Sequence, residues 1–488
     1  MDEDLSVVLV SNRGPISFRE EGDHYGISRG AGGMAGALDP VARRLGDRAT
    51  WIAAATSETD KEALAEGAAD RLKEELGYSL HLLDLDPDIY SRYYDDSSNR
   101  MLWFAVHCLW DELGIKGFGK RELRAWTTGY EPVNARFAEA ALALAEPETL
   151  VLFQDYHLTL APGFVRRARP QQTIFHFTHS SWCGPEGFER LPDPIPRDVV
   201  EGMLGADLIG FHVTPWVEGF LRSCESIGAA VDRASGSVLH DGRRSWVRAY
   251  PIPTDPTDLK ERAHSETVRK WAEDFRSGGE GPLVVRADRT EPSKNIVRGF
   301  QAFGRLLDKR EDLRGSARFI ACLYASRHSM PEYRRYTEDI ERTVREVNRE
   351  HPDSVELFLE DNYDRAIGAL LEYDALLVNP IMDGMNLVSK EGPAVNARDG
   401  VLVLSKGAGS FEELGDAAVT IEDALDIEAT AEALGRAIDM PSAERARRAR
   451  VLRDRAEGRT PAQWIESQID DLVRVQAGDE PYTAACDL

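Results

Sequence analysis

The sequence predicts an α/β protein with two doubly wound parallel sheets, and three observations support this. Short apolar, β-branched runs alternate with amphipathic helical patterns along the chain, which is typical of parallel strands covered by helices on both faces. The 488 residues are too many for one ordinary core. Three prolines within residues 250–256 end a strand and prevent regular structure. We expect two Rossmann-like domains of similar size with a deep cleft between them.

The predicted strands are runs of four or five residues, too short for buried helices. The helical patterns between them include the stripe Ile296, Phe300, Phe303 and Leu307, whose spacing places four apolar side chains on one helix face. The strands are expected at residues 6–10, 149–153, 173–177, 208–211, 283–287, 319–323, 375–378 and 401–404.

The proline-rich segment sets the domain boundary. We place the N-terminal domain at residues 1–252 and the C-terminal domain at residues 253–460. A last amphipathic helix is expected at about 461–475, and the segment 461–488 can pack on either domain.

Composition and charge exclude several classes of function. With 42% hydrophobic residues and no apolar run of about 20 residues, the chain is expected to be a cytoplasmic protein without a membrane span. The N-terminus is acidic where a signal peptide is basic. The net charge of −25 opposes binding to nucleic acid or anionic lipid, so any phosphate site must be a local island of arginine and lysine.

The five cysteines are scattered and form no C-x-x-C pair. They are Cys108, Cys183, Cys224, Cys322 and Cys486. We expect reduced thiols, with no structural zinc and no disulfide framework.

The segment 383–391, which reads D-G-M-N-L-V-S-K-E, follows an apolar strand and begins a helical pattern. We expect the helix to start directly after Gly384, so that unpaired backbone N–H groups at Met385, Asn386 and Leu387 face a phosphate. Glu391 follows one turn later, and its carboxylate suits the two hydroxyls of a ribose. The alternative is a capped helix that follows a buried strand and binds nothing.

A second candidate phosphate site follows the strand 283–287. Arg289 and Lys294 lie five residues apart in a proline-containing loop, so both can close on one diphosphate. The alternative is a solvated loop whose cations pair with Asp288 and Glu291.

Two further segments near the N-terminus have ligand-binding features. Arg13 lies in S-N-R after the first strand, and Gly33 lies in the glycine-rich run 29–36 before a helix. That run is neither a G-x-G-x-x-G fingerprint nor a Walker loop, so a flexible surface turn remains the alternative.

Polar residues also end two later strands. Asp155 follows one strand, and His176 and His179 end the next. A carboxylate and imidazoles at adjacent strand ends can bind sugar hydroxyls or act as acid and base. The alternative is that the histidines are satisfied structural residues.

Seven motifs follow one another along the chain. They are S-N-R, A-G-G, Tyr94 with Asn99 and Trp103, D-Y-H-L, F-x-H, R-x-x-P-S-K and D-G-M-N-L-V-S-K-E. The set resembles that of the trehalose-6-phosphate synthase family, and the resemblance runs from about residue 6 to 475. It implies the GT-B fold, in which the final helix crosses back to the N-terminal domain. It also implies a retaining hexosyltransferase that moves glucose from UDP- or GDP-glucose to glucose 6-phosphate.

On this resemblance, the acceptor half of the site lies mainly in the N-terminal domain. Arg13, Tyr94 and Arg327 are expected to hold the acceptor phosphate. Trp103 would shape that pocket, and Asp155 would bind the acceptor's glucose hydroxyls.

The same resemblance places the donor glucose and ribose. Gly33 would bring its backbone against the donor, while His179 and Asp383 would bind the donor glucose. Glu391 would take the ribose.

The donor diphosphate would be held by Arg289, Lys294 and the N–H groups of Asn386 and Leu387. The implied mechanism is a same-face substitution in which the leaving diphosphate takes the acceptor's proton. No metal and no cofactor are implied, because the nucleotide sugar is itself a substrate. A rival mechanism uses Asp155 or His179 as nucleophile or base.

Three departures from the family pattern concern the acceptor. The chain has Gln154 before D-Y-H, S-S-W-C after His179, and W-I-A-A-A-T around Trp51. A sister enzyme with another acceptor is therefore an alternative, such as a glucosylglycerol-phosphate synthase or a pseudo-glycosyltransferase. A non-catalytic sugar-phosphate sensor is a further alternative. The partners implied are small-molecule substrates, and the sequence leaves open whether the chain forms a homo-oligomer.

Overall fold

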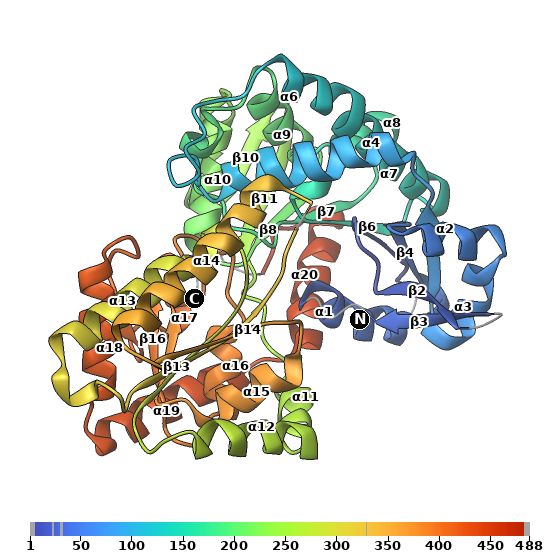
Figure 1. The fold of residues 1–488 in the computed structure, drawn as a ribbon. Helices are drawn as coiled ribbons and strands as arrows, with labels where there is room; N and C mark the ends of the chain where they lie inside the picture. Colours follow the sequence, from blue (N-terminus) through green and yellow to red (C-terminus); the bar gives the residue numbers. More distant parts are fainter. Residues whose placement is uncertain (1–4, 22–23, 30–32, 328, 483–488) are drawn as a thin grey trace. The chain divides into compact units, whose positions relative to one another are not determined.

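The computed structural model describes residues 5–21, 24–29, 33–327 and 329–482. Its chain forms two compact units, shown by sequence colour in Figure 1. The first unit runs to Pro251 and also takes in the C-terminal segment from Pro461. The second unit is Ile252–Thr460.

The first unit is built on a nine-stranded sheet in the order β5-β4-β1-β6-β7-β8-β11-β10-β9. The strands from β5 to β11 pair in parallel, and β10 and β9 extend the sheet as an antiparallel edge. The strands are β1 (Val7–Val10), β4 (Ala49–Ala54), β5 (Ser79–Leu83), β6 (Leu150–Gln154), β7 (Ile174–Phe177), β8 (Leu208–Phe211), β9 (Ala230–Asp232), β10 (Ser237–His240) and β11 (Arg243–Ala249).

The first six strands of this sheet follow the order 3-2-1-4-5-6, counted along the chain, which is that of a dinucleotide-binding fold. A separate hairpin joins β2 (Ile16–Glu21) to β3 (His24–Arg29). The helices of this unit are α1 (Gly33–Leu45), α2 (Glu58–Ala65), α3 (Ala68–Leu76), α4 (Pro87–Ser91), α5 (Trp103–Val106), α6 (Lys120–Ala125), α7 (Glu131–Leu144), α8 (Ala161–Ala168), α9 (Ile195–Met203), α10 (Thr214–Ser226) and α20 (Pro461–Gln476).

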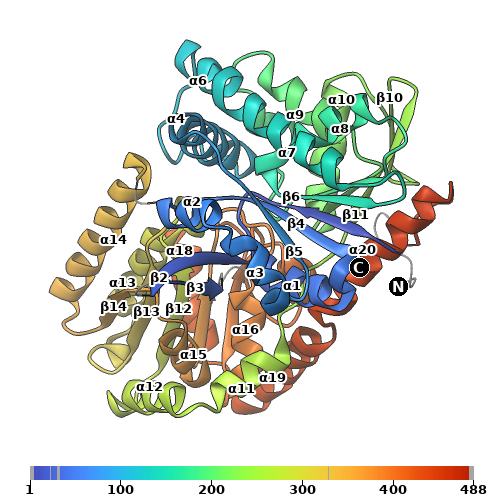
Figure 2. The ribbon, with the colours of Figure 1, turned by 90° about the vertical axis from the view of Figure 1, so that its right-hand side faces the viewer.

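Helix α20 is held in the first unit by hydrogen bonds that two of its buried residues, Trp464 and Asp471, form with Tyr250. The indole Nε1 of Trp464 donates to the carbonyl of Tyr250 at 2.9 Å, and the Tyr250 hydroxyl donates to Asp471 at 2.8 Å. The helix packs along α1, and both ribbon views show the red α20 beside the blue α1 (Figures 1 and 2). The chain therefore returns to its first unit after completing the second.

The second unit is built on a six-stranded parallel sheet with the same 3-2-1-4-5-6 topology, in the order β14-β13-β12-β15-β16-β17. Its strands are β12 (Leu283–Arg289), β13 (Arg318–Tyr324), β14 (Val355–Leu359), β15 (Ala375–Val378), β16 (Val401–Ser405) and β17 (Val419–Ile421). Its helices are α11 (Pro256–Ala263), α12 (Glu266–Ser277), α13 (Ile296–Lys309), α14 (Pro331–Glu350), α15 (Tyr363–Glu372), α16 (Val388–Val395), α17 (Phe411–Leu414), α18 (Ile427–Ile438) and α19 (Ser442–Glu457).

The predicted stripe of helix α13 faces the core of the second unit. Ile296, Phe300, Phe303 and Leu307 are fully buried there, and the rings of Phe300 and Phe303 contact Phe319 of β13. This packing fixes α13, and with it the loop that precedes the helix.

Within the described part of the chain, no helix is long and apolar enough to cross a membrane. The four cysteines in that part carry free thiols, and Cys486 lies outside it.

Candidate functional site

The predicted site residues gather where each sheet reverses its strand order. In the first unit this switch point lies between β1 and β6, and Arg13 and Asp155 follow those two strands. In the second unit it lies between β12 and β15, where Arg289 ends β12 and Asp383 follows β15. Ligands of doubly wound sheets bind outside the carboxyl ends of strands at such points. Each unit therefore presents its own candidate half-site.

The S-N-R motif anchors an exposed arginine. Ser11 and Asn12 are buried, where the Ser11 hydroxyl accepts from the Trp51 indole at 2.8 Å and the Asn12 amide donates to Tyr90 at 3.2 Å. Arg13 is exposed, and its guanidinium donates to the Tyr94 hydroxyl at 3.2 Å. The motif thus combines a fixed backbone with a cation that remains accessible to an anion.

The ring of Tyr94 links this arginine to the strand end of β6. It stacks on the imidazole of His157 with 5.7 Å between ring centroids and 14° between planes. His157 Nδ1 lies 3.5 Å from a carboxylate oxygen of Asp155. Arg13, Tyr94, His157 and Asp155 therefore form one continuous cluster, and three of these four residues were predicted.

Asp155 is an ionised carboxylate in a strained loop. Its backbone φ of 72° is unusual for a residue with a side chain, and its second oxygen accepts from the backbone N–H of His179 at 3.1 Å. Burial would raise the pKa of Asp155, but the hydrogen bond and electrostatic interaction with His157, and the interaction with His179, hold it well below the usual value. The side chain accepts hydrogen bonds and binds protons weakly.

His179 is a neutral imidazole. Its Nε2 lies 3.0 Å from Oε1 of Gln154, and burial lowers its pKa to about 4. Burial also lowers the pKa of His176 to about 4, and neither ring nitrogen of His176 has a partner among the described residues. Both histidines remain uncharged at neutral pH.

Trp103 lies at the end of an unusual helical stretch. The segment Arg92–Leu102 is π-helical, and the hydroxyls of Ser97 and Ser98 donate to carbonyls five residues back, at 2.9 and 2.8 Å. Trp103 itself is buried, and its ring centroid lies 5.4 Å from that of Tyr156. The residue packs behind the Asp155 loop.

Gly33 is the first residue of α1. The glycine-rich segment 30–32 that precedes it lies outside the described residues, so the predicted backbone approach to a ligand is not described there.

In the second unit, Lys294 is enclosed by carboxylates from two loops. Its Nζ lies 2.5 Å from Oδ2 of Asp383 and 3.7 Å from Oδ1 of Asp288. The other oxygen of Asp288, Oδ2, accepts from Nε of Arg286 at 2.8 Å. Burial would lower the pKa of Lys294, but Asp383 and Asp288 raise it, so the ammonium stays charged. The loop is not solvated at Pro292, Ser293 and Lys294, which are buried. The ion pairs expected from the alternative of a solvated loop are nevertheless present, between Lys294 and Asp288 and between Arg289 and Glu291.

Arg289 is paired through a carboxylate from its own loop. Glu291 is fully buried, and its Oε1 lies 3.3 Å from a guanidinium nitrogen of Arg289 and 3.2 Å from one of Arg327. Arg327 also donates to the Tyr333 hydroxyl at 2.7 Å. The side chain of Arg289 remains 40% exposed, so it can still meet a ligand.

The segment 384–387 differs from the prediction. Helix α16 begins at Val388, not directly after Gly384, so Asn386 and Leu387 lie in a loop. Asn386 takes a left-handed φ of 70°, and its side chain donates to Asp383 at 3.0 Å and accepts from the Ser389 backbone. These bonds stabilise the loop and delay the helix.

The loop nevertheless leaves backbone donors available. Within the described residues, the N–H groups of Asn386 and Leu387 have no hydrogen-bond acceptor. Two successive unpaired N–H groups before a helix form a suitable cradle for an anion.

Glu391 lies in the first turn of α16 and is half-buried. Its Oε1 accepts from the Tyr363 hydroxyl at 3.3 Å. Burial raises its pKa to about 7, although Tyr363 and the charge of Lys294 act in the other direction. Glu391 thus titrates near neutral pH.

Sequence reasoning missed three residues of these half-sites. His157 was within a quoted motif, but its contact with Asp155 depends on the turn after β6. Glu291 was considered only as part of a solvated loop, and Tyr363 comes from α15 with no motif around it. No signal in the sequence distinguished Tyr363 from other tyrosines.

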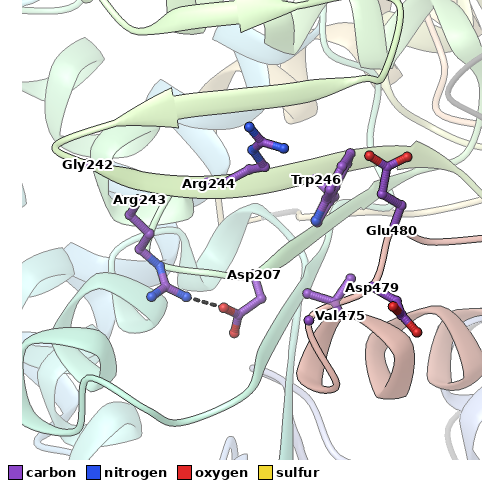
Figure 3. A pocket seen from close by; sticks show the side chains of 9 residues that line it. Asp207, Gly242, Arg243, Arg244, Trp246, Val475, Asp479 and Glu480 are labelled. Atoms are coloured by element: carbon purple, nitrogen blue, oxygen red, sulfur yellow. Dashed lines mark hydrogen bonds and ion pairs between the residues drawn. The ribbon is translucent and has the colours of Figure 1, made fainter.

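A pocket of about 470 Å³ lies at the end of the first unit's sheet that is opposite to the half-site (Figure 3). Asp207 precedes β8 and Arg243 begins β11, so the pocket faces the amino ends of the parallel strands. Asp207 is already paired with Arg166 and Arg243. The pocket is therefore separate from the half-site at the carboxyl ends.

Among the described residues, the three side chains arranged so that they can hold one metal ion together are Asp308, Glu350 and His351. They lie at the ends of α13 and α14, and none of them belongs to the half-sites.

Comparison with known sequences adds three likenesses. A model of glycosyltransferase family 20 matches residues 5–474. Trehalose-6-phosphate synthase of Mycolicibacterium smegmatis is 32% identical over 495 residues, which cover 98% of this chain and 94% of that protein. The bifunctional trehalose-6-phosphate synthase/phosphatase of Thermoproteus tenax is 30% identical, and the match covers 99% of this chain and 65% of that protein.

Among solved structures, the α,α-trehalose-phosphate synthase (UDP-forming) from Burkholderia xenovorans in complex with glucose-6-phosphate is similar, with a TM-score of 0.79 and 25% identity. The match covers 96% of this chain and all of that one. The two-unit α/β architecture predicted from the sequence is therefore shared over nearly the full length.

Proposed function

Because this chain belongs to glycosyltransferase family 20, we propose that it is a trehalose-6-phosphate synthase. It transfers glucose from a nucleoside diphosphate glucose to glucose 6-phosphate and retains the anomeric configuration. The nucleotide sugar is a substrate, and the reaction needs no further cofactor.

The observation that carries this proposal is the cationic half-site of the second unit. In a chain of net charge −25, Arg289, Lys294 and Arg327 gather at one switch point, next to the unpaired N–H groups of Asn386 and Leu387. Such a local island of donors is what a diphosphate requires in an otherwise repulsive protein.

The donor roles follow from these contacts. Arg289, Lys294 and the two loop N–H groups hold the diphosphate. Asp383 binds the donor glucose, and Glu391 binds the ribose through its carboxylate. His179 and Gly33 contribute to the donor glucose from the first unit.

The acceptor roles rest on the first unit's cluster. Arg13 and Tyr94 bind the acceptor phosphate together with Arg327, because a guanidinium fork and a phenol both donate to phosphate oxygens. Asp155 binds the acceptor's hydroxyls, and Trp103 shapes the pocket from behind. The similar structure from Burkholderia xenovorans is a complex with glucose-6-phosphate, which supports this compound as the acceptor.

In the proposed reaction, the bond between the anomeric carbon and the diphosphate oxygen breaks while a bond to the acceptor's hydroxyl oxygen forms on the same face. The acceptor's proton passes to the departing diphosphate. The half-site lowers the barrier by holding and stabilising the leaving charge, an effect worth about 3 kcal/mol per donor group.

The electrostatics disfavour the rival mechanism with an enzymic base. A histidine with a pKa of about 4 is a weak base at neutral pH, and His179 is such a residue. The pKa of Asp155 is also held well below its usual value. Both groups are better suited to accept hydrogen bonds from sugar hydroxyls.

At two of the three departures from the family pattern the chain has a tryptophan that is buried in the core, which supports glucose 6-phosphate over another acceptor. Trp182 is fully buried against Phe188, Phe211 and Phe220, and Trp51 is fully buried in β4. At the third departure, Oε1 of Gln154 lies 3.0 Å from the imidazole Nε2 of His179.

The test is mass spectrometry of the purified protein incubated with glucose 6-phosphate and either UDP-glucose or GDP-glucose. We expect a disaccharide phosphate with UDP-glucose, since the Burkholderia relative is named as UDP-forming. Product from GDP-glucose alone would change the donor but keep the reaction. If the folded protein makes no product from either donor, the proposal is wrong.

A further inference from the structure

We propose that Glu291 is a positioning residue shared by both substrates: it orients Arg289 toward the donor diphosphate and Arg327 toward the acceptor phosphate. This inference rests on the proposed function. No motif of the sequence assigns Glu291 a role, and its importance follows from its contacts in the second unit.

The two arginines meet at a single oxygen. Oε1 of Glu291 lies 3.3 Å from Arg289, 3.2 Å from Arg327 and 3.0 Å from the hydroxyl of Ser326. Arg289 ends β12, whereas Arg327 follows β13, the neighbouring strand. One carboxylate thus ties together the ends of two adjacent strands.

The charges require such a bridge. Two guanidinium groups this close to one carboxylate repel each other, and a buried carboxylate between them offsets the repulsion and fixes both forks. Burial would raise the pKa of Glu291, but Arg289, Arg327 and Lys294 lower it, so the bridge is ionised.

The backbone on both sides holds the bridge in place. The N–H of Glu291 donates to the carbonyl of Arg289 at 2.8 Å, and its carbonyl accepts from Lys294 at 3.0 Å. Arg327 has a left-handed φ of 48°, which costs energy for a residue with a side chain and persists only when its surroundings enforce it.

The exposure of the three side chains distinguishes positioning from simple core stability. Glu291 is fully buried, whereas Arg289 is 40% exposed and Arg327 is 11% exposed. The carboxylate is therefore enclosed, whereas Arg289, and to a smaller extent Arg327, retain exposed surface. Oε2 of Glu291 is also buried and has no hydrogen-bond partner among the described residues. A carboxylate that served only the stability of the core would be expected to have both oxygens hydrogen-bonded.

The consequence is a coupled effect on both substrates. Glu291→Gln keeps the size of the side chain and removes its charge, so both arginines lose their fixed orientation. We expect the Kd for UDP and the KM for glucose 6-phosphate each to rise about tenfold. Calorimetry with UDP and initial rates with varied glucose 6-phosphate measure the two quantities, and thermal unfolding checks the fold.

Two control variants separate this role from others. Tyr333→Phe removes the second partner of Arg327 and leaves Arg289 intact, so it is expected to raise only the KM for glucose 6-phosphate. Glu428 also bridges two cations, Arg305 and Lys309, but is 46% exposed and outside the half-site. Glu428→Gln is expected to change neither constant.

The outcomes are distinct. If the wild type makes no product and binds no UDP, the proposed function fails. If the wild type is active and Glu291→Gln leaves both constants unchanged, or changes only one of them, the shared role is wrong. Should Glu291→Gln fail to fold, Glu291→Asp decides. It retains the charge on a shorter arm, so both constants should rise together by a smaller factor, and a change confined to one substrate overturns the inference.

Discussion

The ammonium group of Lys294 lies 2.5 Å from a carboxylate oxygen of Asp383, although 88 residues separate the two in the chain. They meet because β12 and β15 are neighbours in the sheet and both loops leave the same edge. A lysine held by Asp383 and Asp288 is fixed in position before a ligand arrives, and fixed charge is what stabilises a departing diphosphate.

The two cations of the donor loop should respond differently to removal. Lys294→Ala leaves two buried carboxylates without their cation, so we expect about a hundredfold loss of kcat together with a loss of stability of about 3 kcal/mol. Arg289→Ala affects a partly exposed side chain, so kcat should fall similarly with a smaller change in the melting temperature. Steady-state rates and thermal unfolding of both variants check this contrast; equal melting temperatures would argue against the buried charge cluster.

Donor binding should depend on pH through Glu391, whose pKa is about 7. Below this pH the carboxyl is protonated and accepts ribose hydrogen bonds less well, so UDP affinity should fall about tenfold from pH 8 to pH 6. Protonation of the UDP phosphate also contributes to the pH dependence of the affinity. Glu391→Gln is the control, because its pH dependence contains the phosphate contribution alone. Identical pH profiles for both proteins, measured by calorimetry, would remove Glu391 from the ribose site.

The same raised pKa predicts the sign of a stability change. The native state binds this proton more tightly than the unfolded chain, whose glutamate pKa is about 4.5. The stabilising contribution is therefore complete below the unfolded value and is lost as the pH rises through 7. As the pH rises from about 4.5 to about 7, the free energy of unfolding of the wild type should therefore fall relative to that of Glu391→Gln. Denaturant unfolding of both proteins at several pH values can measure this difference.

His157 should affect the acceptor without affecting the donor. His157→Phe keeps an aromatic ring against Tyr94 and removes the partner of Asp155. We expect the KM for glucose 6-phosphate to rise about fivefold, in line with the loss of about 1 kcal/mol of binding, while the Kd for UDP stays constant. An unchanged KM would mean that the contact with Asp155 does not orient the acceptor site.

Gly219 of α10 should be essential for packing near the histidine loop. A Cβ at this position would lie 2.0 Å from the carbonyl oxygen of Trp182, which follows His179 by three residues. Gly219→Ala is expected to destabilise the first unit by about 2 kcal/mol and to lower its melting temperature. Gly36→Ala is the matched control, since nothing lies within 4 Å of a Cβ there; similar losses in both variants would contradict the packing argument.

The sequence alone determined the fold class and the eight strands expected from apolar runs, because a strand buried on both faces must be apolar throughout. Edge strands were not predicted. β9 carries exposed residues and β17 has only three residues, so neither produces a clear pattern.

The sequence also singled out the segments that we propose carry the chemistry, since Arg289, Lys294, Asp383 and Glu391 stand in motifs whose spacing suits a diphosphate and a ribose. It gave the wrong start for helix α16, because the side-chain bonds of Asn386 compete with the helix and cannot be read from spacing.

Only the tertiary structure decided the pairings. Glu291 meets Arg327 across 36 residues, and Tyr94 meets His157 across 63 residues, because parallel strands bring their loops to one edge of the sheet. Local sequence fixes which side chain each strand end presents. Strand order decides which of these side chains form ion pairs or stack their rings, and that order is set by packing over the whole unit.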